Sequence, residues 1–148
     1  MRKNIKKYRG VETTIGACYH AQMKKGKIIP NGVVLKEHEN ATVVFLTEIG
    51  YDVELIPKSN VEGVHTPDVK IGRIKWEMKS PKGEGKYLIA NTIQRAVKQS
   101  NNIIIDLRRT KRHQAKCLHE IKKEFVKSNS IKRLKVIMKN NKIVDFYK

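Results

Sequence analysis

The residues of this chain that most plainly suggest chemistry are two carboxylates and a lysine: Asp68, Glu77 and Lys79. They lie in two strand-like runs, residues 68–71 and 74–79. Gly72 and Arg73 separate the runs, and a pair with glycine first suits a tight hairpin turn. Because side chains alternate along a strand, Lys79 shares a face with Glu77. Counting back across the turn places Asp68 directly opposite Glu77, with Cβ atoms about 5 Å apart.

Two carboxylates so placed repel each other unless a cation lies between them. A hard divalent ion such as Mg²⁺ accepts one or two carboxylates, with waters and phosphate oxygens as its other ligands. Such an ion polarises a phosphate ester and activates a bound water, and the Lys79 amine could hold that water or the developing negative charge. The pattern therefore predicts a divalent-metal site, Mg²⁺ first, with Mn²⁺ or Zn²⁺ as alternatives. The competing interpretation is a solvated hairpin whose acidic and basic side chains pair with one another.

The elements that must position these residues follow from the spacing of apolar and turn-forming residues. That spacing predicts an α/β domain with a mixed central sheet and flanking helices. Trp76 shares its strand face with Ile74 and Met78, so we expect it in the core rather than as a base-stacking surface. We predict a mobile arm at 1–10, helices at 37–49, 88–100 and 113–127, and strands at 13–20, 27–35, 52–56, 68–71, 74–79, 103–107, 132–138 and 142–147.

The chain reads as one domain, residues 1–148, without repeats or a dividing linker. Its N-terminal arm and strands occupy 1–36, the residues that carry the chemistry occupy 37–112, and a basic helix and closing hairpin occupy 113–148. Two cysteines are too few for a disulfide framework, and no apolar run is long enough for a membrane span, so we expect no membrane insertion.

The charge of the chain points to an anionic partner. Its 32 Lys and Arg against 14 Asp and Glu give a net charge of +18. Nucleic acid ranks first, because a polyanion releases counterions on binding such a surface; an anionic membrane or an acidic protein follows. A basic run follows the strand expected at 103–107. Its side chains could contact phosphates, or the run could be an ordinary solvated loop. The basic residues are Arg108, Arg109, Lys111 and Arg112.

Pro67-Asp68 followed by Glu77-Met78-Lys79 resembles the signature of the PD-(D/E)XK nuclease superfamily, and the predicted element order over 37–112 matches its αβββαβ core. The longer stretches 65–68, 76–83 and 99–109 are similar to the C-terminal tRNA nuclease toxin domain of CdiA contact-dependent growth inhibition proteins.

The resemblance implies roles for individual residues. Asp68 and Glu77 would be metal ligands, and Lys79 the catalytic lysine. Glu39 would contribute a further acidic group at the metal, with Glu37 as its rival. Gln99, or less well Gln94, would lie near the active site. Ser80 and Lys82 would flank the substrate, although ordinary loop chemistry explains them equally well.

Together with the metal site and the basic charge, the resemblance implies a metal-dependent nuclease that hydrolyses phosphodiester bonds in RNA, tRNA foremost, as a toxin. It would act in the cytoplasm after delivery as part of a larger protein, and an acidic immunity protein would cover its active site. Two alternatives are a DNA endonuclease with the same site and a basic nucleic-acid-binding module without catalysis.

Overall fold

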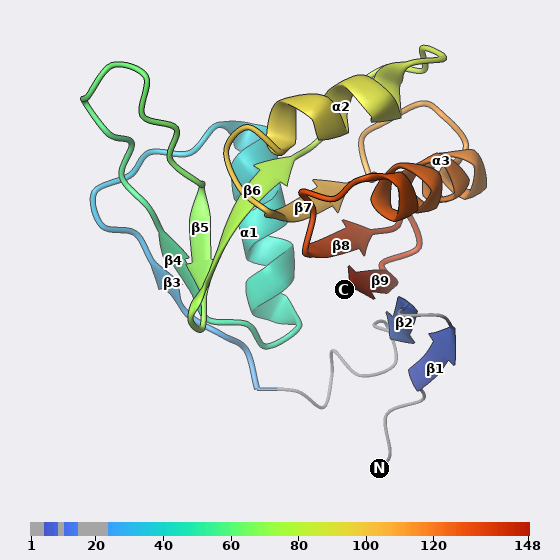
Figure 1. Cartoon of the computed structure of the whole chain (residues 1–148). Coiled ribbons are helices and arrows are strands. Elements are labelled where there is room, and N and C mark those ends of the chain that lie inside the picture. Colours follow the sequence, from blue (N-terminus) through green and yellow to red (C-terminus); the bar gives the residue numbers. More distant parts are fainter. Residues whose placement is uncertain (1–4, 9–10, 15–23) are drawn as a thin grey trace.

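The chain folds into one mixed sheet with three helices packed on it, in a computed structural model that describes residues 5–8, 11–14 and 24–148 (Figure 1). The elements in chain order are β1 (Ile5–Tyr8), β2 (Val11–Thr14), β3 (Ile28–Ile29), α1 (Glu37–Glu48), β4 (Val53–Leu55), β5 (Val69–Ile71), β6 (Ile74–Lys79), α2 (Leu88–Ala96), β7 (Asn102–Asp106), α3 (Gln114–Lys127), β8 (Arg133–Ile137) and β9 (Ile143–Tyr147). The predicted α/β class is confirmed.

The strands are ordered β1-β2-β9-β8-β7-β6-β5-β4-β3 across the sheet. The three central strands, β6, β7 and β8, are parallel. Two parallel neighbours need a crossover connection, and α2 and α3 supply the two crossovers here. The hairpins β4–β5–β6 and β8–β9 are antiparallel. From α1 to β7 the order is therefore helix, three strands, helix, strand, as the sequence predicted.

The middle strand β7 divides the core into two apolar clusters. Ile103 and Ile105 pack with side chains of α2 and α3, such as Ile89 and Ile121. Ile104 points the other way and packs with α1 and with Trp76. This confirms both the strand buried on two faces and the core position of Trp76, whose side chain is 6% exposed.

The hairpin between β5 and β6 has the predicted register over most of its length, with Ile71 opposite Ile74 and Val69 opposite Trp76. Gly72 has a φ of +61°, which suits the first position of its tight turn. The regular pairing stops one residue short of the expected pair, because the Asp68 N–H donates to the carbonyl of Trp76 over 3.0 Å. This offset corrects the prediction that Asp68 lies directly opposite Glu77.

Several predicted boundaries near the N-terminus were wrong. The expected arm at 1–10 contains β1, which pairs with β2. The strand expected at 27–35 is only two residues long, because the chain turns where Asn31 and Gly32 have positive φ angles. The strand expected at 13–20 coincides with β2 at residues 13–14, and its remainder lies outside the described residues.

The second helix is shorter than the predicted 88–100, since α2 ends at Ala96. The chain must turn there to begin β7 beside β6. Ser100 and Asn102 assist this turn by donating side-chain hydrogen bonds to the carbonyl of Lys75, each at 3.2 Å. In residues 5–8, 11–14 and 24–148, no helix is both long and apolar enough to cross a bilayer.

A buried polar cluster fastens α1 to the end of β7. Asp106, 2% exposed, accepts a hydrogen bond from the Thr42 hydroxyl at 2.7 Å and pairs with the Arg108 guanidinium at 2.8 Å. Arg108 also donates to the carbonyl of Ala41 at 3.0 Å and lies over the ring of Phe45. The first turns of α1 are therefore held at one place on the sheet.

Replacing Asp106 with alanine is expected to lower the free energy of unfolding by about 2–4 kcal/mol, because Arg108 would keep a partly buried charge without its partner. Thr42→Val should cost about 1 kcal/mol, the loss of one hydrogen bond. Urea unfolding followed by circular dichroism measures both. Glu48→Ala, at an exposed position of α1, is the control; an Asp106→Ala protein no less stable than this control would contradict the anchoring role.

Candidate active site

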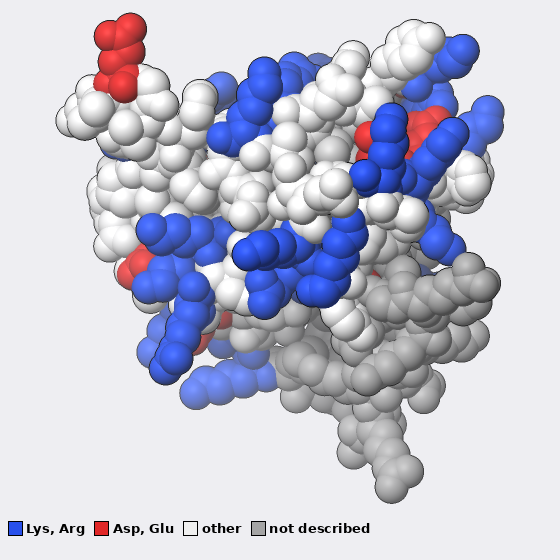
Figure 2. Space-filling view, viewed as in Figure 1, with Lys and Arg blue, Asp and Glu red and all other residues white. Residues whose placement is uncertain are grey.

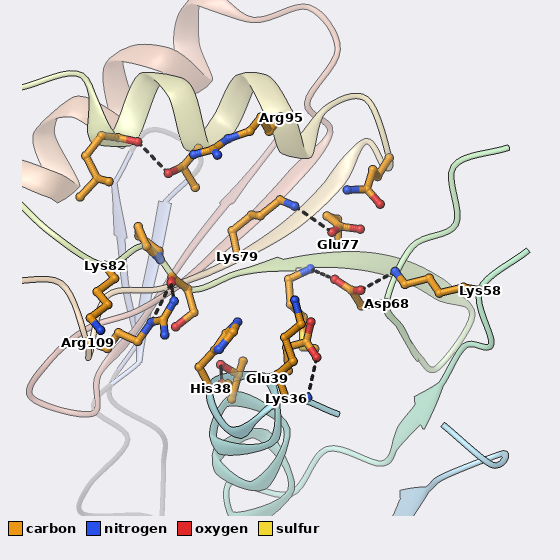
Figure 3. Close-up of a pocket in the computed structure, with 17 residues that line it drawn as sticks. Lys36, His38, Glu39, Lys58, Asp68, Glu77, Lys79, Lys82, Arg95 and Arg109 are labelled. Carbon is orange, nitrogen blue, oxygen red and sulfur yellow. Dashed lines mark hydrogen bonds and ion pairs between the residues drawn. The ribbon is translucent and has the colours of Figure 1, made fainter. Parts of the chain in front are cut away.

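A cleft of about 440 Å³ opens between α1, α2 and the end of β6. Figure 3 shows its lining side chains converging from both helices, from β6 and from the neighbouring loops. Lys82 and Arg109 lie at one end, Lys58 and Asp68 at the other, and Lys79 between them. The lining residues are Lys36, His38, Glu39, Thr42, Lys58, Asp68, Glu77, Met78, Lys79, Ser80, Pro81, Lys82, Leu88, Thr92, Arg95, Gln99 and Arg109.

The three residues singled out for chemistry meet in this cleft. Glu77, 2% exposed, forms an ion pair with Lys79, with 3.2 Å between Nζ and Oε1. Its other oxygen, Oε2, is buried and has no hydrogen-bond partner in the described part of the chain. Asp68 is anchored beside it, since its Oδ2 accepts the backbone N–H of Met78 at 2.8 Å.

The carboxyl of Glu77 holds its proton more tightly than an exposed glutamate does. Burial and then the neighbouring Asp68 carboxylate raise the pKa of Glu77 to about 7, although the ammonium of Lys79 acts in the opposite direction. Burial disfavours the charged form, and a second carboxylate repels it. The site therefore contains a carboxylate whose negative charge is only partly compensated by the protein.

Lys58, which the sequence analysis did not single out, supplies part of that compensation. Its ammonium lies 2.7 Å from Oδ1 of Asp68. Burial lowers the pKa of Lys58, but the nearby carboxylates of Asp68, Glu77 and Glu39 outweigh that effect and raise it. The Lys58 ammonium, from the loop after β4, is thus a cation that reduces the repulsion among these carboxylates.

The donor set fits a hard divalent ion. Asp68 and Glu77 offer the one or two carboxylates that Mg²⁺ takes from a protein, and the unpartnered Oε2 of Glu77 is a free ligand atom. Lys58 is 60% exposed, so it can swing into solvent and yield its place at Asp68. No group of three or more His, Cys, Asp or Glu side chains suited to a metal forms among the described residues, so water and substrate oxygens would complete the shell.

Glu39 lines the cleft, but it has a local structural task. Its carboxylate accepts the backbone N–H of Lys36 at 2.9 Å, at the start of α1. This hydrogen bond satisfies one of the free donors of a helix N-terminus. Its assignment as a metal ligand stays a prediction. Its rival Glu37 is exposed and does not line the cleft.

The other predicted contact residues divide into two groups. Gln99, Ser80, Lys82 and Arg109 line the cleft, whereas Gln94 is exposed on α2 and does not. Arg108 and Arg112 are engaged within the protein, Arg108 with Asp106 and Arg112 with Glu120, and Lys111 is exposed outside the cleft. For Arg108 and Arg112 this engagement leaves little of the guanidinium for phosphate, since these side chains are 27% and 17% exposed.

Sequence reasoning missed several cleft residues on the two helices. Lys36 and His38 begin α1, and Thr92 and Arg95 lie one and two turns after Leu88 on the same face of α2. Helical spacing could have indicated the shared face of Thr92, Arg95 and Gln99. Nothing in the sequence indicates that α1 and α2 face each other across β6.

The fold and the cleft define a class: a basic α/β domain with a buried carboxylate, a second carboxylate and a lysine at the floor of a cation-lined cleft. The sequence profile of the contact-dependent growth inhibition CdiA C-terminal domain family matches residues 65–143, more than half of the chain. The chain belongs to this family. The matched segment contains Asp68, Glu77, Lys79 and Gln99, but not α1 with Glu39.

A solved structure, the "CdiA-CT/CdiI toxin and immunity complex from Burkholderia pseudomallei", contains a chain of similar fold. The two chains are 21% identical and superpose with a TM-score of 0.64 over 83% of this chain and 100% of that one. No curated protein sequence matches the chain.

Replacing Glu77 with glutamine is expected to stabilise the metal-free protein at pH 8. A carboxyl whose pKa is raised in the folded state binds its proton more tightly there, so folding stability falls as pH rises from about 4.5 to about 7. The neutral amide avoids this loss, which is at most about 3 kcal/mol and is reduced by the lost ion pair with Lys79.

Urea unfolding at pH 5 and pH 8 in the presence of a chelator tests this expectation, with Glu48→Gln as the exposed control. The gain from Glu77→Gln should appear at pH 8 and vanish near pH 5. A stability difference that is the same at both pH values would contradict the raised pKa. Added Mg²⁺ should raise the melting temperature of the wild type at pH 8 and not that of Glu77→Gln.

Proposed function

We propose that this domain is a metal-dependent nuclease of the PD-(D/E)XK type, which hydrolyses phosphodiester bonds in RNA, with tRNA as its expected substrate. The observation that carries the proposal is the buried Glu77 carboxylate. It has one unpartnered oxygen, it lies beside Asp68 and Lys79, and it faces a cleft lined by six Lys and Arg side chains. A fold gains no stability from such a carboxylate, so a task in binding or catalysis explains it best.

The chemistry would divide among the residues of the cleft. Asp68 and Glu77 would hold a divalent ion, which would supply polarisation of the scissile phosphate and easier deprotonation of the attacking water. Lys79 holds the attacking water or stabilises the charge that develops on the phosphate. Lys82 and Arg109 at one end and Lys58 at the other would orient the phosphates on either side of the scissile bond.

The charge of the molecule supports nucleic acid as the substrate. On the face shown in Figure 2, Lys and Arg side chains cover much more of the surface than Asp and Glu do. Such a surface attracts a polyanion over a long range and speeds its capture. The preference for RNA and for tRNA rests on the likeness of the stretches 65–68, 76–83 and 99–109 to the CdiA tRNA nuclease toxins. The proposal that the domain acts as a delivered toxin in the cytoplasm rests on the same likeness. A DNA endonuclease with the same site is the nearest alternative.

Substitution of the proposed catalytic groups should abolish cleavage without unfolding the protein. Glu77→Gln and Lys79→Ala are each expected to lower the rate of tRNA cleavage in Mg²⁺ by a factor of about 100 or more, because each removes a group that acts on the reacting phosphate or water. Lys75→Ala, at an exposed position of β6 outside the cleft, should leave the rate unchanged.

Gel analysis of purified tRNA and of plasmid DNA, each with and without a chelator, measures this result and separates the two substrates. Undiminished cleavage by Glu77→Gln would reject the assigned site, and cleavage unaffected by a chelator would reject the metal. Salt-sensitive binding of tRNA with no products from the wild type would favour a binding module instead.

The proposed toxin implies a partner that neutralises it, and the matched Burkholderia pseudomallei structure is itself a toxin and immunity complex. We expect an acidic protein, encoded beside this chain, to cover the cleft and block cleavage in a one-to-one complex. Charge reversal by Lys82→Glu should weaken that complex and reduce its sensitivity to salt, whereas Lys75→Glu should have little effect. Calorimetric titration measures both. An equally tight complex with Lys82→Glu would show that the partner binds elsewhere.

A further inference from the structure

The loop between β6 and α2, residues 80–87, is held in place by the segment that follows β7. The Arg109 guanidinium donates to the carbonyl of Ser80 at 2.8 Å. The Thr110 hydroxyl and the Lys111 N–H both donate to the carbonyl of Gly83. Because these bonds fix a loop rich in lysine and glycine, its side chains project from a defined backbone. Two residues of the predicted phosphate-binding run, Arg109 and Lys111, therefore also support this loop.

Tyr87 is the last residue of this loop, directly before a residue that lines the cleft. Its neighbour Leu88 is the first cleft-lining residue of α2, and consecutive Cα atoms are about 3.8 Å apart. The backbone around Tyr87 is fixed, because its carbonyl accepts the N–H of Asn91 at 3.0 Å and the Leu88 N–H donates to Gly85 at 3.1 Å. A nucleotide strand that leaves the cleft beside Leu88 would therefore pass close to Tyr87.

The side chain of Tyr87 has no evident structural task. It is 64% exposed, belongs to neither of the two core clusters and makes no side-chain hydrogen bond that caps α2. Large aromatic side chains lose favourable free energy when they remain in water, so an exposed ring on a fixed backbone suggests a binding contact.

The surroundings of Tyr87 favour a strand of nucleic acid over an apolar partner. The Lys86 ammonium lies 5.5 Å from the centre of the Tyr87 ring. Lys82 and Arg109 lie in the adjoining cleft, and Glu84 is the one acidic residue of residues 80–87. An aromatic ring with cations beside it is the arrangement that binds single-stranded nucleic acid, since the ring stacks on a base while the cations contact the backbone.

We propose that Tyr87, with Lys86, forms a stacking site for an unpaired base of the strand that leaves the cleft beside Leu88. This inference rests on the proposed nuclease function and deepens it, because it names the form of the substrate: a single-stranded segment, a loop or an end, rather than a continuous duplex. A paired and stacked base cannot place its face on an aromatic ring, so duplex would bind through its phosphates alone. Stacking tolerates any base, so Tyr87 selects strand form rather than sequence.

The test uses the full chain with Glu77→Gln to prevent cleavage. Binding of a fluorescein-labelled single-stranded RNA octamer and of a duplex of the same sequence is measured by anisotropy in Mg²⁺. Tyr87→Ala is expected to weaken binding of the single strand by about 5- to 100-fold and to leave duplex binding unchanged. Tyr87→Phe should retain most of the affinity, since stacking needs the ring and not the hydroxyl.

Tyr147→Ala removes another exposed tyrosine, at the end of β9 and outside the cleft, and should change neither affinity. Thermal melting checks that each variant is folded. Equal weakening for single strand and duplex, or no weakening at all, would overturn the stacking site while leaving the nuclease proposal intact. Effects of Tyr87→Ala only on binding of an immunity protein would overturn it as well. If the Glu77→Gln parent bound neither nucleic acid, the proposed function itself would fail.

Discussion

The structure of the site depends on one electrostatic conflict: the buried carboxylate of Glu77 lies beside a second carboxylate, Asp68. Burial and like charge both work against ionisation, and they raise the pKa of Glu77 to about 7. The ammonium groups of Lys79 and Lys58 offset this repulsion only in part, since Oε2 of Glu77 has no hydrogen-bond partner within the described residues. Such a site suits the divalent cation and the anionic substrate that we propose for it.

The sheet holds the two carboxylates of Asp68 and Glu77 close together. Glu77 and Lys79 project from β6, which is locked between β7 and β5 by backbone pairing. Asp68 is fixed by the offset at the end of the hairpin, where its carboxylate replaces a backbone acceptor for the N–H of Met78. The offset that interrupts the regular strand pairing thus also orients the carboxylate of Asp68 toward the backbone of β6. Because Asp68 is hydrogen-bonded to β6 through both its backbone N–H and its carboxylate, separating it from Glu77 would break these bonds.

The cleft around them is assembled from distant parts of the chain. The cluster at Asp106 fixes α1 on the sheet, and the hydrogen bonds from Arg109 and Thr110 fix the loop that carries Lys82 and Tyr87. The basic segment after β7 thereby serves two purposes. Arg108 and Arg112 are engaged mainly in ion pairs within the protein, and Arg109 supports the loop while it lines the cleft. A run of positive charge in sequence is therefore not one phosphate-binding surface in space.

Local patterns in the sequence determined much of the fold. Alternation along β6 separated Trp76 from Glu77, the turn at Gly72 set the hairpin register, and apolar spacing located the three helices to within four residues at each end. Only the tertiary structure decided the offset at Asp68 and the early end of α2. It also decided that Lys58 lies beside the carboxylates and that Arg108 forms an ion pair inside the protein while Arg109 lines the cleft. The physical reason is range: turns and strand alternation act between near neighbours, whereas burial, ion pairing and the meeting of α1 with α2 depend on residues brought together only when the sheet forms.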